Sequence, residues 1–254
     1  MNSLTRCICA LMGASLLCGL SLKAEQAPDY SDYKQLLETY VEEDGVHYAA
    51  WAADDDAMSA LGEFVEYLGQ VDVNGLAESE QIALYINLYN AAMLLIVLEN
   101  YPLESVKKIG VLPFSVFKKD QIALGDSKVS LDDIEKGILL NQYFDPRIHF
   151  AVNCASESCP PLRAEPFTGD KLEEQLEEQT KLFAESGRAA RLNEKARSIA
   201  YSELFRWYAD DFKGKNPAEY LNQYRNETLP TNYSVEWIPY DWALNEIKKE
   251  TKDE

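Results

Sequence analysis

The residues of this chain best suited to chemistry gather in one short stretch, residues 147–162, which reads RIHFAVNCASESCPPL. It holds Cys154 and Cys159, the only cysteines after residue 24, and His149, one of two histidines in the chain. A cysteine becomes a strong nucleophile when a neighbouring base or positive charge lowers its pKa, and histidine often serves as that base. The stretch therefore predicts a site in which His149 activates a loop cysteine.

Apolar residues at every second position predict that residues 147–153 form a buried strand. On a strand, His149 and Asn153 share one face, whereas Cys154 points to the other face and lies roughly 16 Å from the histidine. Contact between a sulfur and the imidazole therefore requires the chain to turn after Asn153, or Cys159 to fold back on its loop.

A disulfide between Cys154 and Cys159 is the alternative. It would close a loop of six residues and stabilise the fold by about 2 kcal/mol through the entropy of the unfolded chain. His149 would then be a hydrogen-bonded core residue. In that case the protein is a non-catalytic binding or scaffold module, whose disulfide shapes a loop for a peptide or protein partner.

Three further polar residues are candidates for the same site. Asn87 and Asn90 lie three positions apart in the uncharged stretch 82–98, so a helix places both amides on one side. They either tether a neighbouring loop or line a cleft, where one would polarise a substrate carbonyl group. Glu135 either orients His149 or belongs only to a local hydrogen-bond network.

Several classes of function are disfavoured. The spacing of His149, Cys154, Cys159 and Glu135 matches no common zinc pattern, and the chain has no HExxH motif and no glycine-rich phosphate loop. We therefore predict neither a metal site nor a cofactor. The formal net charge of −19 repels nucleic acid and anionic lipid surfaces, so neither is an expected partner.

Patterns along the chain predict a mostly helical α+β single domain with a small sheet, in which a central buried helix packs on the strand that carries His149. Ser130 is expected to cap one helix, and residues 203–212 to form another with Asp210 and Asp211 on a solvated face. The remaining predicted elements are helices with short breaks over 29–69, a hairpin over 114–129, helices over 171–183 and 217–224, and strands over 197–201 and 235–240.

The first 24 residues have the features of a secretion signal: Arg6 is followed by an uncharged, mostly apolar run that ends near Ala24. We expect residues 1–24 to be removed and residues 25–254 to form the domain, exported to the periplasm or secreted, with no stable membrane insertion. A membrane anchor and a lipoprotein modified at Cys18 are weaker alternatives. An oxidising compartment would favour pairing of the two remaining cysteines.

Several segments together resemble an uncharacterised family, the domain of unknown function 547. The resemblance spans residues from about 44 to 245 and implies a single-domain α+β architecture without a settled activity. A histidine often follows the IE pair in this family, whereas Lys136 occupies that position here, which disfavours a site with two histidines. The segments are YINLYNA (85–91), YPLESVKKI (101–109), VSLDDIEKGIL (129–139), DPRIHFAVNCASESCPPL (145–162), FRWYADDF (205–212) and YDWALN (240–245).

Two functions from different classes follow. The first is a thiol-dependent hydrolase or transferase that acts on an amide or peptide-like substrate, with Cys154 or Cys159 as nucleophile and His149 as base. The second is the binding module with a Cys154–Cys159 disulfide. In both, the expected partner is a peptide, an amide-containing substrate or a protein.

Overall fold

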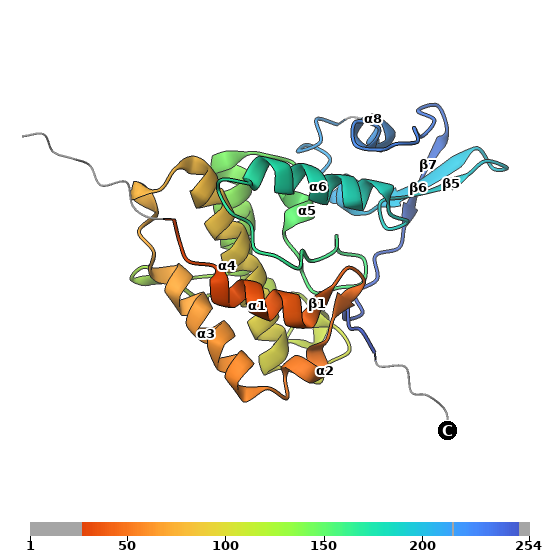
Figure 1. Ribbon diagram of the computed structural model, residues 1–254. Helices are drawn as coiled ribbons and strands as arrows, with labels where there is room; N and C mark the ends of the chain where they lie inside the picture. The colour runs from red at the N-terminus through yellow and green to blue at the C-terminus, as the bar shows by residue number, and fades with distance from the viewer. Residues whose placement is uncertain (1–26, 215, 249–254) are drawn as a thin grey trace, which may run out of the picture.

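The structure is a computed structural model that describes residues 27–214 and 216–248 (Figure 1). At its centre lies helix α4 (Glu78–Glu99), in which 15 of the 22 residues are buried. A helix that is apolar on all sides belongs in a core or in a membrane. Among the described helices only α4 is long and apolar enough to cross a membrane, and 83% of its most apolar window is buried inside the protein, as in a core helix. The helix predicted over residues 82–98 is confirmed.

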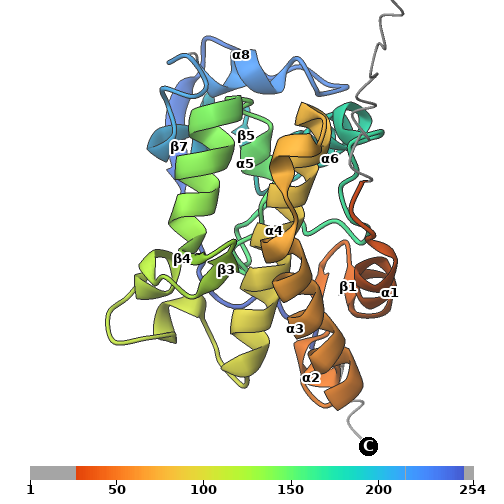
Figure 2. The ribbon, with the colours of Figure 1, turned by 90° about the vertical axis from the view of Figure 1, so that its left-hand side faces the viewer.

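The N-terminal helices cover one side of α4. Helix α3 packs along α4, and α1 packs on α3 (Figure 2). The ring of Tyr33 stacks on that of Phe64 with 4.5 Å between centroids, and Asp54 caps α3 by accepting a hydrogen bond from the backbone N–H of Ala57 at 3.0 Å. The elements of this part are α1 (Ser31–Tyr40), β1 (Val41–Glu42), β2 (Gly45–Val46), α2 (Tyr48–Trp51), α3 (Asp55–Gln70) and η1 (Val73–Gly75).

A π-helix, η4 (Asp133–Tyr143), packs on another side of α4. Ser130 precedes it and caps the N-terminus of the helix, as predicted. Its hydroxyl accepts a hydrogen bond from the N–H of Asp133 at 3.1 Å, and the Asp133 carboxylate accepts one from the N–H of Ser130 at 2.9 Å. The hairpin predicted over 114–129 is shorter than expected, because residues 115–118 form a helical turn instead. The connecting elements are η2 (Val106–Lys108), η3 (Ser115–Lys118), β3 (Ile122–Leu124) and β4 (Ser127–Val129).

The C-terminal half builds a second, smaller core beside the sheet. Strand β6 pairs antiparallel with β5 and parallel with β7. Aromatic side chains fill this core, among them Phe150, Phe183 and Phe205. With 46% helix and 13% strand, the predicted α+β class is confirmed. The elements are α5 (Ile148–Ala151), α6 (Leu172–Glu185), β5 (Ala190–Asn193), β6 (Ser198–Ser202), α7 (Leu204–Trp207), α8 (Pro217–Leu221) and β7 (Ser234–Ile238).

The predicted strand over residues 147–153 is wrong. Residues 148–151 form one helical turn, α5, and the chain becomes extended only at Val152. The apolar alternation has a different cause: Ile148 packs in the main core around α4, whereas Phe150 packs in the aromatic core on the opposite side. One turn placed between two cores therefore produces the same buried pattern as a strand.

The helix predicted over residues 203–212 is also shorter than expected. Only α7 is helical, and the chain turns from Tyr208 onward. This turn brings the rings of Tyr208 and Phe212 to 4.0 Å and 5.5 Å from the ring of His149. A continuous helix was expected because the aromatic spacing also fits one, but packing on the histidine decides the conformation.

Residues 240–247, here called the C-terminal segment, run from β7 back to the N-terminal hairpin (Figure 1). The carbonyl oxygen of Asn245 accepts a hydrogen bond from the N–H of Val46 at 2.9 Å, and that of Ala243 accepts from Glu157 at 2.9 Å. A Cβ atom on Gly45 would lie 2.5 Å from the Asn245 carbonyl oxygen, so this approach requires a glycine. The segment ties the two halves of the chain together.

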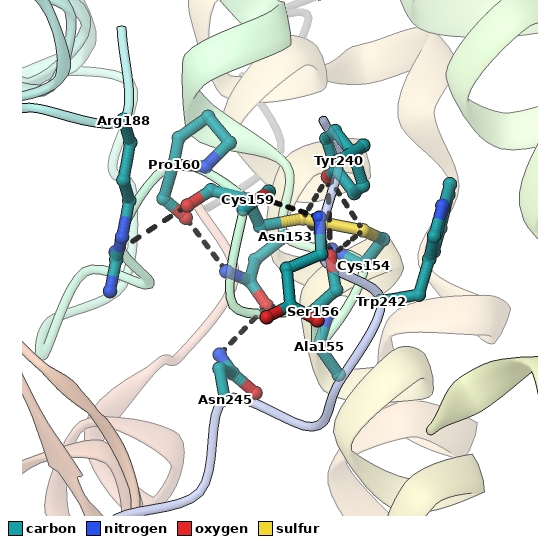
Figure 3. Close-up of a disulfide and its surroundings, with 12 residues drawn as sticks. Asn153, Cys154, Ala155, Ser156, Cys159, Pro160, Arg188, Tyr240, Trp242 and Asn245 are labelled. Atoms are coloured by element: carbon teal, nitrogen blue, oxygen red, sulfur yellow. Dashed lines mark hydrogen bonds between the residues drawn. A yellow bond between two sulfur atoms is a disulfide. The ribbon is translucent and has the colours of Figure 1, made fainter. Parts of the chain in front are cut away.

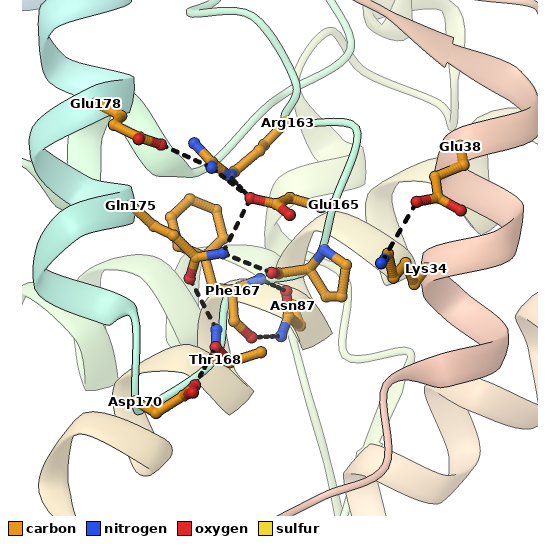
Figure 4. Close-up of polar contacts among 11 residues, drawn as sticks. Lys34, Glu38, Asn87, Arg163, Glu165, Phe167, Thr168, Asp170, Gln175 and Glu178 are labelled. Atoms are coloured by element: carbon orange, nitrogen blue, oxygen red, sulfur yellow. Dashed lines mark hydrogen bonds and ion pairs between the residues drawn. The ribbon is translucent and has the colours of Figure 1, made fainter.

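Two amide side chains of α4 clamp other parts of the backbone. Asn87 donates to the carbonyl oxygen of Phe167 at 2.7 Å and accepts from its N–H at 2.9 Å (Figure 4). Asn90 donates to the carbonyl oxygen of Ala151 at 2.9 Å and accepts from the N–H of Asn153 at 2.8 Å. Both amides are almost fully buried, so each satisfies two backbone groups that water cannot reach.

We predict that Asn87→Ala and Asn90→Ala each lower the free energy of unfolding by about 1–3 kcal/mol, because each leaves a buried N–H and a buried C=O without a partner. Denaturant unfolding followed by circular dichroism measures the change. Asn74→Ala is the matched control, since Asn74 is exposed and bonds only to the nearby Asp72. If both α4 variants unfold at the wild-type denaturant midpoint, these hydrogen bonds do not stabilise the fold.

Candidate functional site

The loop that carries both cysteines starts where Asn90 clamps the end of α5. Asn153 then closes the loop from inside: its side-chain N–H donates to the carbonyl oxygen of Pro160 at 2.8 Å, and its side-chain oxygen accepts from the N–H of Ala155 at 2.8 Å (Figure 3). Ala155 has φ +59°, a left-handed conformation that the turn requires. One side chain thus fixes both ends of the cysteine loop.

Cys154 and Cys159 form a disulfide, with their Cα atoms 6.4 Å apart (Figure 3). Of the two alternatives that the sequence left open, the disulfide-closed loop is the one in this structure. Cys159 is buried, with 4% of its surface exposed, whereas Cys154 is partly exposed.

Hydrogen-bond donors surround the sulfur of Cys159. The backbone N–H of Cys154 donates to it at 3.0 Å, and the hydroxyl of Tyr240 donates to it at 3.3 Å. The hydroxyl of Ser156 in turn donates to the Tyr240 oxygen at 3.2 Å. Burial raises the pKa of Tyr240 to about 12, so this phenol keeps its proton at neutral pH and remains a donor.

A pocket of about 290 Å³ lies against the disulfide. Both cysteines line it, together with His149 and Glu135. Most of the remaining wall is aromatic, and the rings come from α4, the residues around η3, the α7 turn and the C-terminal segment: Tyr89, Phe114, Phe117, Trp207, Tyr208, Tyr240 and Trp242. The size lies at the lower end of the range for small-molecule sites, and the mixture of aromatic rings with a few polar groups is typical of such sites.

His149 pairs with Asp211, not with Glu135. The Nε2 atom of His149 lies 2.7 Å from an Asp211 carboxylate oxygen, whereas Glu135 accepts a hydrogen bond from the Tyr208 hydroxyl at 3.0 Å. Of the two roles predicted for Glu135, the structure shows a hydrogen bond in a local network, and the carboxylate that holds the imidazole comes from the α7 turn. With Asp211 as acceptor, the neutral ring carries its proton on Nε2, which leaves Nδ1 as the basic nitrogen.

The sequence predicts Asp211 on a solvated helix face, whereas its carboxylate pairs with His149. Tyr208 and Asp211 both contact the histidine, and local spacing gives no indication of this contact. Burial lowers the pKa of His149, and the hydrogen bond that the imidazole donates to Asp211 opposes this shift only in part. The imidazole is therefore neutral at physiological pH.

Four of the six predicted site residues line the pocket: Cys154, Cys159, His149 and Glu135. Asn87 and Asn90 do not, because both amides are engaged with backbone groups as described above. A pocket that contains His149 and both cysteines is present, but neither amide is exposed in it. The aromatic walls were missed, although the segments 205–212 and 240–245 each contain two rings that line the pocket.

The residues that the structure describes contain no group of three or more histidine, cysteine, aspartate or glutamate side chains arranged to hold a metal ion. The predicted signal sequence, residues 1–24, lies outside the described residues.

Residues 73–184 match the family model described as "Protein of unknown function, DUF547". The matched segment contains α4, η4, α5 and the cysteine loop, and it supports the DUF547 family suggested by the sequence motifs. Comparison with curated proteins finds no match, and comparison with solved structures finds none.

The burial of His149 gives a prediction for pH dependence. In the unfolded chain a histidine titrates near pH 6.5, whereas in the folded protein the pKa of His149 is lower. Below about pH 6.5 the unfolded state therefore binds more protons, and the free energy of unfolding falls as the pH decreases through this window.

We predict that His149→Gln makes the loss of stability between about pH 7.5 and about pH 5 smaller than in the wild type. His47→Gln is the matched control, because the His47 side chain is partly exposed and pairs with Glu42 on the N-terminal hairpin. Denaturant titrations at a series of pH values measure the difference, and equal slopes for His149→Gln and wild type would contradict the prediction.

Proposed function

We propose that this domain is a binding module whose pocket takes an apolar side chain of a peptide or another amide-containing ligand, with the Cys154–Cys159 disulfide shaping one wall. The observation that carries this proposal is a cavity of about 290 Å³ lined by seven aromatic rings and both half-cystines. The disulfide favours this function over one that needs a free thiol.

The aromatic walls support binding because they are already packed in place. The ring centroids of Trp207 and Tyr240 lie 4.9 Å apart, those of Tyr240 and Trp242 lie 4.5 Å apart, and those of Phe114 and Trp242 lie 4.7 Å apart. A ligand that enters a preformed pocket does not have to order these side chains, which lowers the entropic cost of association.

The polar groups of the pocket suit an amide better than a bare hydrocarbon. Asp132, Glu135, Lys118 and Lys136 line the same cavity as the aromatic rings. Lys136 pairs with Asp132 at 2.7 Å, so the lining offers both donors and acceptors, as the N–H and C=O of a peptide require. The net charge of −19 disfavours strongly anionic ligands.

Titration with N-acetylphenylalaninamide tests this function through the fluorescence of Trp207 and Trp242. For about 15 non-hydrogen atoms at roughly 0.3 kcal/mol each, we predict a Kd of about 0.5 mM. Trp207→Ala should raise the Kd about tenfold, because a ring of the wall is lost. Trp237→Ala, on β7 outside the pocket, is the matched control and should bind as the wild type does. Wild-type protein that gives no saturable change would contradict the proposal.

A thiol-dependent hydrolase or transferase is the second candidate, and one observation favours it. Both cysteines and the neutral, carboxylate-paired His149 line one cavity. Once the disulfide is reduced, the protein should cleave a peptide p-nitroanilide if His149 activates a cysteine. We expect Cys154→Ser to abolish this release of p-nitroaniline. If the reduced wild-type protein releases none, the hypothesis of a thiol-dependent enzyme is wrong.

Export to the periplasm or secretion is proposed together with either function. The apolar run before Ala24 and the pairing of both remaining cysteines support it. Sequencing the N-terminus of the mature protein tests this proposal, and an intact Met1 would contradict it.

A further inference from the structure

The disulfide has two properties that a cross-link serving only stability does not need. It forms part of the wall of a ligand pocket, and its buried sulfur accepts two hydrogen bonds. Thiol–disulfide exchange requires both properties: one sulfur that an incoming thiolate can reach, and a second sulfur that can leave as a stabilised thiolate.

We propose that the pocket binds ligands that carry a thiol, and that it exchanges disulfides with them through Cys154. This inference rests on the proposed binding function, because it assumes that the ligand enters this pocket, and it adds a chemical class and a reaction. The expected ligand is a cysteine-containing peptide or a similar small thiol with an apolar side chain beside the sulfur.

The two sulfurs differ in access, and this difference assigns their roles. Cys154 is partly exposed, whereas only 4% of the Cys159 surface is exposed. An attacking sulfur from the pocket therefore meets Cys154, and Cys159 is the leaving group. In thiol–disulfide exchange, access decides which sulfur the thiolate attacks, and the stability of its thiolate decides how readily the other sulfur leaves.

The surroundings of Cys159 stabilise a negative charge on its sulfur. The N–H of Cys154 at 3.0 Å and the hydroxyl of Tyr240 at 3.3 Å both donate to this atom. The Cys154 sulfur lies beside the hydroxyls of Ser156 at 3.1 Å and Tyr240 at 3.4 Å, so the fixed backbone donor is what distinguishes Cys159. Hydrogen bonds to the charged form of an acid favour that form, and they favour it more strongly where water is excluded.

The reaction balances without an external oxidant. The ligand thiol releases its proton to solvent, and its thiolate forms a sulfur–sulfur bond with Cys154 while the Cys154–Cys159 bond breaks. Cys159 retains the electron pair as a thiolate. A second ligand thiolate then attacks the ligand sulfur of the mixed disulfide, which yields the ligand disulfide and the reduced dithiol of the protein. Overall, two ligand thiols are oxidised and one protein disulfide is reduced.

The charge and the wall of the pocket define which thiols react well. The negative net charge disfavours anionic thiols, and the aromatic lining favours thiols with an apolar neighbour. Burying one phenyl group in such a pocket accounts for a difference of about tenfold in rate between two otherwise equal probes.

The test compares two uncharged probes, N-acetyl-Phe-Cys-amide and N-acetyl-Gly-Cys-amide, with the oxidised full-length protein near neutral pH. After acid quenching, mass spectrometry of peptides locates and quantifies the mixed disulfide. We expect the mixed disulfide on Cys154, formed about tenfold faster with the phenylalanine probe. Equal rates for the two probes, or equal labelling of Cys154 and Cys159, would overturn the inference without any substitution in the protein.

One variant tests the leaving group. Tyr240→Phe keeps the ring in the wall but removes the donor to Cys159, and it should slow exchange about tenfold. Tyr233→Phe removes an exposed hydroxyl that bonds to Glu194, outside the pocket, and should exchange at the wild-type rate. Exchange by Tyr240→Phe at the wild-type rate would contradict stabilisation of the Cys159 thiolate.

A third probe separates this inference from the function on which it rests. N-acetyl-Phe-(S-methyl)Cys-amide has no free thiol and can only bind, which the tryptophan fluorescence reports. If this probe binds saturably but the two thiol probes exchange at equal rates, the proposed exchange is wrong and the proposed binding function still holds. Absence of binding would overturn the proposed function as well.

Discussion

The hydrogen bonds between Asn90 and the end of α5 are the contacts on which the rest of the site depends. Asn90 lies in the middle of the buried helix α4, and its amide holds the carbonyl oxygen of Ala151 and the N–H of Asn153. No water can replace this amide, because only 3% of the Asn90 surface is exposed. The backbone is therefore fixed at the point where the helical turn carrying His149 becomes the loop carrying the cysteines.

The position of α5 between two cores explains why the pocket forms where it does. Ile148 belongs to the core around α4, and Phe150 belongs to the aromatic core beside the sheet. His149 lies between them in sequence, and its ring packs against Tyr208 and Phe212 at the boundary. Tyr89, Phe114 and Phe117 of the first half and aromatic residues of the second half both line the pocket, so neither half builds it alone.

Much of the fold was predictable from sequence because its signals are local. The uncharged run 82–98 predicts a buried helix, and the Ser130 cap depends on residues within three positions of it. The conformation of residues 147–153 was not predictable, since an apolar alternation arises both in a strand and in a helical turn between two cores. Asp211 was missed for a similar reason: its partner lies 62 residues away, and local spacing alone suggested a solvated face.

The candidate site was predicted in its reactive residues but not in its walls. Cys154, Cys159 and His149 stand out by type and rarity, and all three line the pocket. Tyr240 and Trp242 arrive from the C-terminal segment, whose path depends on hydrogen bonds to the backbone of residues such as Val46 and Glu157. Long-range backbone pairing of this kind leaves no pattern in the local sequence.

The cysteine loop is held by contacts that do not involve its sulfur–sulfur bond. Asn153 spans the loop to Pro160, and the N–H groups of Glu157 and Ser158 donate to carbonyl oxygens of the C-terminal segment at 2.9 Å and 3.2 Å. A disulfide that closes so short a loop contributes only about 2 kcal/mol through the unfolded chain. Its opening therefore removes about this amount of stability and leaves the other contacts of the loop in place. The same contacts fix both ends of the loop, which is the condition that the proposed exchange places on a disulfide that opens and closes within a preformed pocket.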